Sequence, residues 1–131
     1  MENCIFCKIV SGEIPSAKVY EDEKLLAFLD INPVSDGHLL VITKDHYPWM
    51  QDVPDNLISE VFVKIKNIMA KMKDALPCDY VQLSVVGKDI PHFHAHLMPR
   101  YFNDDLHGWP TKKYKEGEIE SLSEKIKASL Q

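Results

Sequence analysis

The fold and chemistry of this chain depend on residues 91–99, Pro-His-Phe-His-Ala-His-Leu-Met-Pro. In a β-strand, successive side chains point to opposite faces. If this stretch is a strand, His92, His94 and His96 share one face at spacings of about 6.5–7 Å, and the apolar residues between them share the other. The stretch therefore predicts a strand that packs on a core with one face and presents a row of imidazoles on the other.

An imidazole row has several chemical uses. The unperturbed pKa of imidazole lies nearest neutrality, which suits it to nucleophilic catalysis, acid–base catalysis or metal binding. The alternative is a chance cluster of surface or core histidines without a function. The regular placement of three histidines on one face argues against chance. His94 and His96 also form an H-x-H pair, a spacing that catalytic zinc sites use.

Size, composition and charge narrow the class of protein. A chain of 131 residues is one domain that can build a core without disulfides. No apolar run reaches the 18 or so residues of a membrane span, and the N-terminus has no signal-peptide pattern, so we expect a cytoplasmic protein with no membrane partner. The net charge of −5 and the lack of a basic run argue against long nucleic-acid partners but not against a small anionic ligand.

The three cysteines do not suggest a disulfide framework. Cys4 and Cys7 form a C-x-x-C pair at the start of the chain, whereas a redox pair normally follows a strand and opens a helix. A structural zinc site needs four ligands, so two more must come from elsewhere, and histidines supply such ligands readily. Residue spacing alone leaves open both a metal site and a pair of reduced thiols. Cys78 is expected to be a small buried hydrophobe.

Hydrophobic periodicity predicts five strands and three helices. The expected strands are 18–21, 25–30, 38–43, 79–86 and 92–99, and the expected helices are 4–10, 54–76 and 118–130. The long helix has an apolar stripe, which we interpret as core packing. Only this helix separates the third strand from the fourth, so repeated βαβ units are absent. The pattern predicts an α+β domain with an antiparallel sheet.

Three separated blocks resemble the histidine triad (HIT) family of nucleotide hydrolases and transferases. Residues 92–98 match its His-φ-His-φ-His-φ-φ signature, where φ is apolar, and residues 25–46 and 4–15 resemble its other blocks. The resemblance covers about residues 3–101. It implies a HIT-like fold, with a five-stranded antiparallel sheet, one long helix and shorter terminal helices. It also implies a single domain over residues 1–131, with a C-terminal tail and helix at 102–131, and a homodimer.

The resemblance assigns roles to three histidines. His94 is implied to be the nucleophile that attacks the α-phosphate of a nucleotide and forms a nucleotidyl-histidine. His96 is implied to lie beside the phosphate and to assist the leaving group, and His38 to complete the cluster. The second ring nitrogen of His94 should donate its proton to a fixed acceptor, either a backbone carbonyl or His38.

The family pattern also implies a nucleotide pocket. Asp30 is implied to accept hydrogen bonds from the ribose hydroxyls, although a turn or cap role is the ordinary one for aspartate. Phe6, Phe28 and Ile31 are implied to line the base pocket, with core packing as the alternative. The site so described takes a small nucleotide substrate.

One block departs from the family pattern. The connection at residues 87–91 is about four residues shorter than the usual glycine-rich stretch before the triad. Lys88 falls near the usual glutamine and Ser84 near the usual upstream amide, so the resemblance does not define how the leaving group is recognised. Lys88 is expected either to favour phosphate or to be solvated on the turn. Arg100 is expected either to meet phosphate or to form a surface ion pair.

A branch of the family that begins with C-x-x-C holds a zinc ion. The matching positions here are Cys4, Cys7, His46 and His92. Two thiolates and two imidazoles make a closed tetrahedral structural site. The resemblance therefore implies a structural zinc that fixes the N-terminus to the strand that carries His94.

We therefore expect a nucleoside phosphoramidase or nucleotidyl hydrolase that acts at the α-phosphate of purine nucleotides. The alternatives are a dinucleoside polyphosphate hydrolase, a nucleotide-binding regulatory protein with weak turnover, and a hydrolase with a catalytic zinc on His94 and His96.

Overall fold

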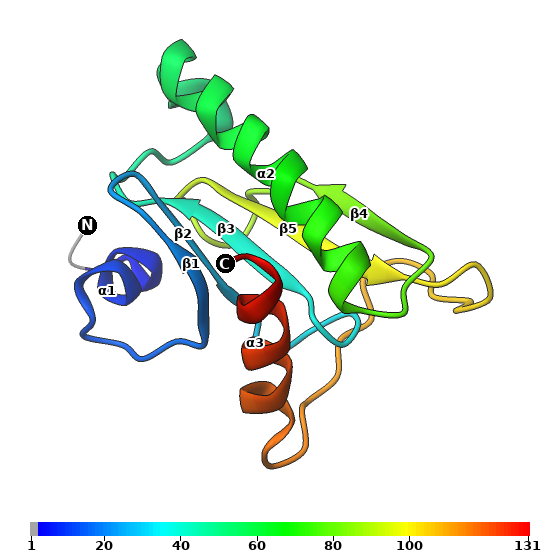
Figure 1. Cartoon of the computed structure of the whole chain (residues 1–131). Helices are drawn as coiled ribbons and strands as arrows, with labels where there is room; N and C mark the ends of the chain where they lie inside the picture. Colours follow the sequence, from blue (N-terminus) through cyan, green and yellow to red (C-terminus); the bar gives the residue numbers. More distant parts are fainter. Residues whose placement is uncertain (1–2) are drawn as a thin grey trace.

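A five-stranded antiparallel sheet forms the centre of the computed structural model, which describes residues 3–131 (Figure 1). The strands are β1 (Lys18–Glu21), β2 (Leu25–Leu29), β3 (Leu39–Thr43), β4 (Tyr80–Ser84) and β5 (His94–Arg100). Their order across the sheet is β1-β2-β3-β5-β4, and every neighbouring pair is antiparallel. The predicted α+β architecture is confirmed.

Helices cover the two faces of the sheet unequally. The long helix α2 (Asp55–Ala75) and the C-terminal helix α3 (Glu118–Ser129) lie on one face (Figure 1). The short helix α1 (Ile5–Ser11) packs on the other face, and a 3-10 turn, η1 (Met50–Asp52), precedes α2. No helix of residues 3–131 is both long enough and apolar enough to cross a membrane.

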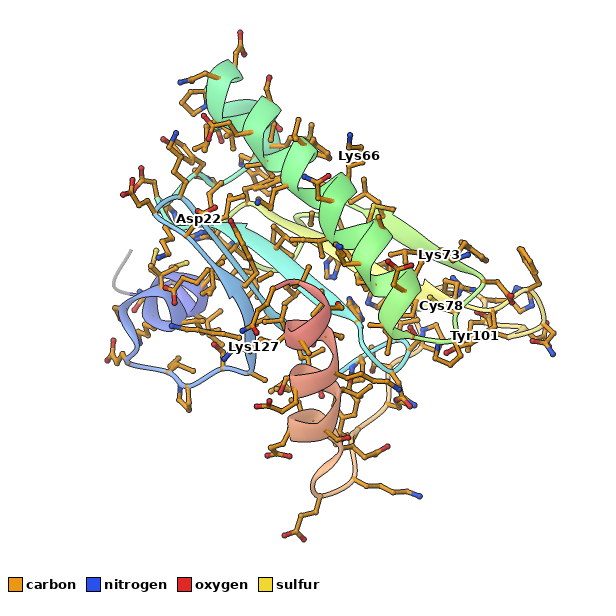
Figure 2. The ribbon with its side chains drawn as sticks, viewed as in Figure 1. Asp22, Lys66, Lys73, Cys78, Tyr101 and Lys127 are labelled. Carbon is orange, nitrogen blue, oxygen red and sulfur yellow. The ribbon has the colours of Figure 1, made fainter. Side chains whose placement is uncertain are left out.

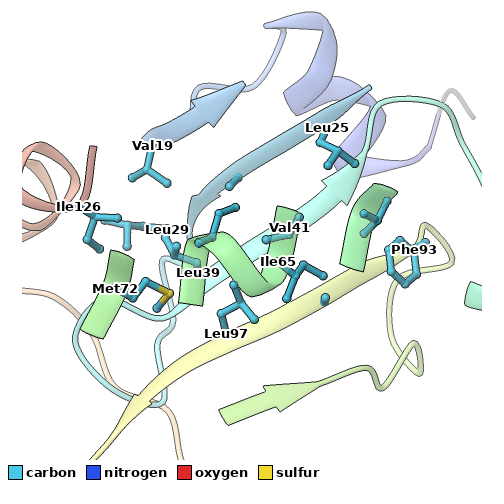
Figure 3. Packing of buried hydrophobic residues seen from close by; sticks show 14 of the residues in the cluster. Val19, Leu25, Leu29, Leu39, Val41, Ile65, Met72, Phe93, Leu97 and Ile126 are labelled. Carbon is cyan, nitrogen blue, oxygen red and sulfur yellow. The ribbon is translucent and has the colours of Figure 1, made fainter. Parts of the chain in front are cut away.

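The central strands β2 and β3 are buried throughout because both of their faces are covered. On the α2 side, Val41 and Leu97 pack with the α2 residues Ile65 and Met72 (Figure 3). The buried positions of α2 recur every three or four residues, as its sequence predicts. Lys66, on the outer side of α2, is exposed (Figure 2).

The structure shortens four of the predicted strands: β2 and β3 are each one residue shorter than predicted, and β4 and β5 differ more. β4 ends at Ser84, and β5 begins at His94 and continues to Arg100. The prediction that His92 lies within the strand is wrong. The backbone there turns away from β3, because the N–H of Phe93 donates to the carbonyl oxygen of Tyr47 at 2.6 Å and that of His92 to Ile90 at 2.9 Å.

The register of β5 against β3 decides which face carries the imidazoles. Ile42 of β3 pairs with His94, and Leu40 pairs with His96. Leu40 and Ile42 belong to the apolar cluster around α1, so both imidazoles lie on the face opposite α2. The triad is thus a row of two strand residues, preceded by a third histidine that a turn displaces.

A glycine shapes the loop that leads into β3. Gly37 has a φ of 92°, and a Cβ atom there would lie 2.7 Å from Leu76 Cδ1 and 3.3 Å from Pro99 Cγ. Only glycine fits both the left-handed backbone and the close approach. This turn sets the position of His38, which immediately precedes β3.

Candidate functional site

A backbone carbonyl fixes the orientation and tautomer of His94. Its Nδ1–H donates to the carbonyl oxygen of His92 at 2.8 Å. A carbonyl only accepts, so Nδ1 carries the proton and Nε2 keeps a free lone pair. The Phe6 ring packs edge-on against the His94 ring with the centroids 5.0 Å apart. Of the two acceptors that the sequence left open, the structure has the backbone carbonyl.

His38 and His96 form a directional hydrogen-bond chain that begins at a backbone amide. The N–H of Val34 donates to His38 Nδ1 at 3.0 Å, so the proton of neutral His38 must be on Nε2. His38 Nε2 lies 3.0 Å from His96 Nδ1, which therefore accepts. The remaining ring nitrogen of His96, Nε2, then carries a proton that is free to be donated.

Neither His38 nor His96 is easily protonated, because the pKa values of both rings are lowered. Burial is the main cause that lowers the pKa of His38 to about 3, and the neighbouring His96 lowers it further. Burial likewise lowers the pKa of His96 to about 4, with a smaller contribution from His94. Both rings are consequently neutral at physiological pH.

Asp30 lies beside this chain at the end of β2. One carboxylate oxygen accepts the N–H of Asn32 at 2.9 Å, and the other lies 3.8 Å from His38 Nε2. Its side chain is 20% exposed, so a ligand can reach it. Burial raises the pKa of Asp30 above its usual value, and the Asn32 hydrogen bond opposes this.

The residues expected around the nucleotide have different environments. Phe6 and Phe28 are buried and pack edge-to-face at 5.8 Å, whereas Ile31 is 69% exposed. Ser84 of β4 pairs with His96 across the sheet. Lys88 is exposed in the connection from β4 to β5.

A second cluster brings together Cys4, Cys7, His46 and His92. His92 Nδ1 lies 3.3 Å from Cys4 Sγ and 3.5 Å from Cys7 Sγ, and His46 Nδ1 lies 3.3 Å from Cys7 Sγ. Tetrahedral zinc bonds of about 2.3 Å to sulfur and about 2.0–2.1 Å to nitrogen place sulfur and nitrogen about 3.5 Å apart. The observed separations match this spacing.

The tautomer of His92 also suits a cation. His92 Nε2 lies 2.7 Å from the carbonyl oxygen of Thr43 and must donate to it, which leaves the Nδ1 lone pair facing the sulfurs. Burial, together with the neighbouring Cys4, raises the pKa of Cys7 to about 11. A bound metal removes such a proton, so the four residues fit a zinc ion.

Asp30, His38 and His96 also place potential ligand atoms close together. Here the tautomer opposes metal binding, because the nitrogen of His38 that faces the other two residues holds the proton. Neither of the two potential metal clusters among residues 3–131 includes His94. The geometry therefore gives no support to a catalytic zinc on His94 and His96.

Arg100, for which the sequence left two roles open, and Lys44 each have a structural partner. Arg100 Nε binds Asp104 at 2.6 Å, and another of its nitrogens donates to Gln82, so the ion-pair interpretation holds. Lys44 pairs with Glu21 at 2.8 Å. Cys78 is buried in the core on the α2 side, as expected.

Side-chain patterns could not reveal the groups that fix the tautomers. These groups are the amide of Val34 and the carbonyls of Thr43 and His92, and backbone groups leave no residue-type signal. The structure also places Trp109, from the segment after β5, edge-on against His96 at a centroid distance of 4.8 Å. In the sequence, its place after His107-Gly108 in a polar segment fits a cap on the pocket, an exposed tryptophan and a core tryptophan equally well.

Comparisons with known proteins agree with this geometry. The model of the HIT domain matches residues 11–103. Protein hit from Bacillus subtilis is 41% identical over 138 aligned positions, which cover 98% of this chain and 95% of that protein. An adenosine 5′-monophosphoramidase from Schizosaccharomyces pombe is 36% identical over 98% of both chains.

A solved structure extends the likeness to three dimensions. The crystal structure of a zinc-bound histidine triad family protein from Mycobacterium smegmatis superposes with a TM-score of 0.87 and 29% identity. The match covers 98% of this chain and 94% of that one. With the sheet, the histidine row and the family model in agreement, this chain belongs to the HIT domain family.

Proposed function

We propose that this protein cleaves a phosphoramidate or phosphoanhydride bond at the α-phosphate of a purine nucleotide and transfers the nucleotidyl group through His94 to water or another acceptor. The supporting observation is the free Nε2 atom of His94, whose partner nitrogen is anchored on the His92 carbonyl at 2.8 Å. A neutral imidazole nitrogen is a good nucleophile that forms a covalent intermediate. The adenosine 5′-monophosphoramidases among the relatives support the purine and the bond type.

The first step forms a nucleotidyl-histidine. The Nε2 lone pair of His94 bonds to phosphorus, and the bond from phosphorus to the leaving atom breaks with its electron pair on that atom. A phosphoramidate nitrogen that has first taken a proton from solvent departs as a neutral amine, and an anhydride oxygen departs as phosphate. The positive charge that His94 gains is stabilised by the hydrogen bond from Nδ1–H to the His92 carbonyl. Water then cleaves the intermediate and releases a proton.

His96 acts in this proposal as a neutral hydrogen-bond donor to an oxygen on which negative charge develops, either on the α-phosphate or at an anhydride leaving group. Its Nδ1 accepts from His38, so its Nε2–H is the free donor beside His94, and the two rings lie 5.0 Å apart. A preorganised donor aimed at developing charge lowers the barrier without reorganisation during the reaction. His38 is the positioning residue that keeps this proton on Nε2.

The nucleotide is bound on the α1 face of the sheet. Asp30 accepts the ribose hydroxyls, and Phe6, Phe28 and Ile31 form the base pocket. The exposure of Ile31 and the burial of the two rings suit a pocket whose outer wall is open until a base covers it. Ser84 and Lys88 contact the phosphate or the leaving group from the β4 side.

We also propose a structural zinc ion held by Cys4, Cys7, His46 and His92. When bound, zinc supplies a tetrahedral crosslink and no reaction step. The sulfur–nitrogen separations of 3.3–3.5 Å and the neutral Nδ1 of His92 support this assignment. The crosslink ties α1, which carries Phe6, to the turn just before His94.

Residues 1–131 are further proposed to form a single domain, with a core at 3–101 and a C-terminal part at 102–131, that pairs as a homodimer. The burial of Ile126 of α3 in the core with Met72 supports one domain. The edge strand β4 and the chain after it expose Leu83, Val85 and Val86, a surface that a second copy can cover. Sedimentation velocity should give about twice 15.0 kDa, and a mass of one chain would contradict pairing.

The test of the enzyme is His94→Asn, with His107→Asn as the matched control. Asparagine has no nucleophilic nitrogen, so hydrolysis of adenosine 5′-phosphoramidate should fall at least about a thousandfold, while AMP affinity by calorimetry stays within about threefold. His107 is exposed and pairs only with Asp105 among the described residues, so its variant should retain full turnover. Retained turnover in His94→Asn would reject the proposal.

Single-turnover quench experiments separate the alternatives. A substrate labelled at the α-phosphate should leave an acid-labile label on the wild-type protein and none on His94→Asn. Absence of the label would favour a nucleotide-binding regulatory protein. A higher kcat/KM for a dinucleoside polyphosphate than for the phosphoramidate would favour the polyphosphate hydrolase.

A further inference from the structure

Two cysteines lie one helical turn apart at the start of α1. Cys4 immediately precedes the helix, and its Sγ accepts the N–H of Cys7 at 3.4 Å. The N–H of Lys8 donates to the Cys4 carbonyl at 3.1 Å, so the backbone between the two thiols is helical. The two Sγ atoms lie within 4.8 Å of each other. The pair therefore has the spacing of a dithiol that can close to a disulfide, as well as that of a metal site.

The two thiols differ in accessibility. Cys7 is partly exposed, whereas Cys4 is only 8% exposed. A small oxidant can thus reach Cys7 first, and the buried Cys4 lies beside it as a resolving thiol, which is the usual arrangement of redox-sensitive cysteines. The remaining thiol, Cys78, is buried on the α2 side of the sheet and cannot reach either of them.

His92 connects both cysteines to the proposed nucleophile. Its Nδ1 lies 3.3 Å from Cys4 Sγ and 3.5 Å from Cys7 Sγ. Its carbonyl oxygen accepts the Nδ1–H of His94 at 2.8 Å. Phe6, which lies between the two cysteines in the sequence, packs edge-on against the rings of His92 and His94. A change in the bonding of the two sulfurs therefore acts directly on the groups that orient His94.

We propose that Cys4 and Cys7 are a peroxide-sensitive switch: a disulfide between them releases the zinc ion and weakens nucleotide binding. The inference rests on the proposed zinc site and nucleotide pocket. The thiolate is the form of cysteine that binds a metal, so the disulfide removes two of the four ligands and leaves only His46 and His92. Phe6 and the turn at His92 then lose the crosslink that ties them together.

The oxidation balances with one molecule of hydrogen peroxide per chain. The Cys7 thiolate attacks one peroxide oxygen, the O–O bond breaks, and a sulfenic acid forms on Cys7 with release of hydroxide. The Cys4 thiolate then attacks Cys7 Sγ, which forms the S–S bond and expels a second hydroxide. The two sulfurs lose two electrons in total, and the peroxide gains them.

Treatment of the zinc-loaded protein with a small excess of hydrogen peroxide tests the switch. A chromogenic zinc indicator should report release of about one zinc ion per chain. Trypsin cleaves after Lys8, so residues 1–8 form one peptide with both cysteines, and residues 74–88 form the peptide with Cys78. The first peptide should lose about 2 Da, the mass of two hydrogen atoms, while the second keeps its mass.

The affinity for AMP, measured by calorimetry, tests the link to the nucleotide site. Oxidised protein should bind AMP about tenfold more weakly than reduced, zinc-loaded protein, because Phe6 is no longer held in place. Zinc alone should not restore the affinity of oxidised protein, whereas a thiol reductant together with zinc should. Reduced protein that a chelator has stripped should recover with zinc alone, so the two treatments separate disulfide formation from loss of the metal.

Two matched variants sharpen the test. Cys7→His replaces one thiolate by another zinc-binding group that cannot form a disulfide, so its zinc should stay bound in peroxide. Cys78→Ser keeps both cysteines of the switch and should respond as the wild type does. Should Cys7→His fail to fold, Cys4→His removes the other sulfur of the disulfide and makes the same prediction.

Each outcome decides one part of the proposal. Zinc that stays bound to the wild type in peroxide would overturn the switch, and so would a gain of about 32 or 48 Da on the peptide of residues 1–8 in place of the 2 Da loss. Zinc release with unchanged AMP affinity would overturn the link to the nucleotide. Wild-type protein without zinc would overturn the zinc site itself, and reduced, zinc-loaded protein that does not bind AMP would overturn the proposed function.

Discussion

The two clusters of potential metal ligands among residues 3–131, which we call the zinc cluster and the catalytic cluster after their proposed roles, differ in the proton positions of their histidines. In the zinc cluster, the Thr43 carbonyl takes the proton of His92, and the lone pair faces the two sulfurs. In the catalytic cluster, the Val34 amide occupies the lone pair of His38, and the proton faces His96. The same side chain becomes a metal ligand or a proton donor according to the backbone group behind it.

The comparison predicts that the zinc cluster alone controls metal content and carries the largest effect on stability. Cys7→Ser removes one thiolate, so zinc per chain should fall from one to well below one, and the free energy of unfolding should drop by several kcal/mol, on the order of 3–5. Elemental analysis and denaturant titration measure the two quantities. Cys78→Ser is the control for metal content, since its thiol lies in the core on the α2 side. Two zinc ions per chain in the wild type would contradict the prediction, because the catalytic cluster would then also bind metal.

For the catalytic cluster, the expected effect is on turnover rather than on metal. His38→Ala removes the donor that holds His96 in one tautomer, so kcat for adenosine 5′-phosphoramidate should fall about a hundredfold, or about 2.7 kcal/mol in barrier. Zinc content should stay at one per chain. His38→Gln, whose side-chain amide can donate to His96 Nδ1, should recover part of the activity. A loss of zinc in either variant would contradict the separation of the two clusters.

The smallest expected effect concerns stability at mildly acid pH. The folded-state pKa values of His38 and His96, about 3 and about 4, lie below that of an unfolded histidine, about 6.5. The unfolded state therefore binds more protons as pH falls below about 6.5, and folded stability declines until the folded-state pKa values are reached. Denaturant titrations between pH 7 and pH 5.5 should show a loss of about 1–2 kcal/mol. The double variant His38→Asn/His96→Asn should lose part of this slope, and an unchanged slope would contradict the prediction.

Much of the fold could be read from the sequence, because periodicity reports burial directly. β1 has the predicted bounds, and α2 lies within one residue of its predicted bounds at each end. The overestimated strand ends have a physical cause: hydrogen bonds from Phe93 and His92 to residues outside the sheet turn the chain before β5 begins. Side-chain alternation gives no sign of such bonds.

In the candidate site, too, the sequence indicated the side chains but not their backbone partners. Spacing and resemblance identified His94, His96 and the four zinc-cluster residues, and the structure brings the latter together within 4.8 Å. The sequence left the acceptor for His94 open and gave no sign of the partner of His38 Nδ1. Both partners are backbone groups, and their positions follow from the turn at Gly37 and from the chain path before β5.

The pairing register of β5 with β3 links correct packing of the core to correct placement of the histidines. A shift of one residue would turn Ala95 and Leu97 outward and bury two polar rings beneath α2. A molecule with that error would lose its core and its proposed nucleophile together. Selection for a well-packed core would thus also preserve the placement of His94 and His96 on the α1 face.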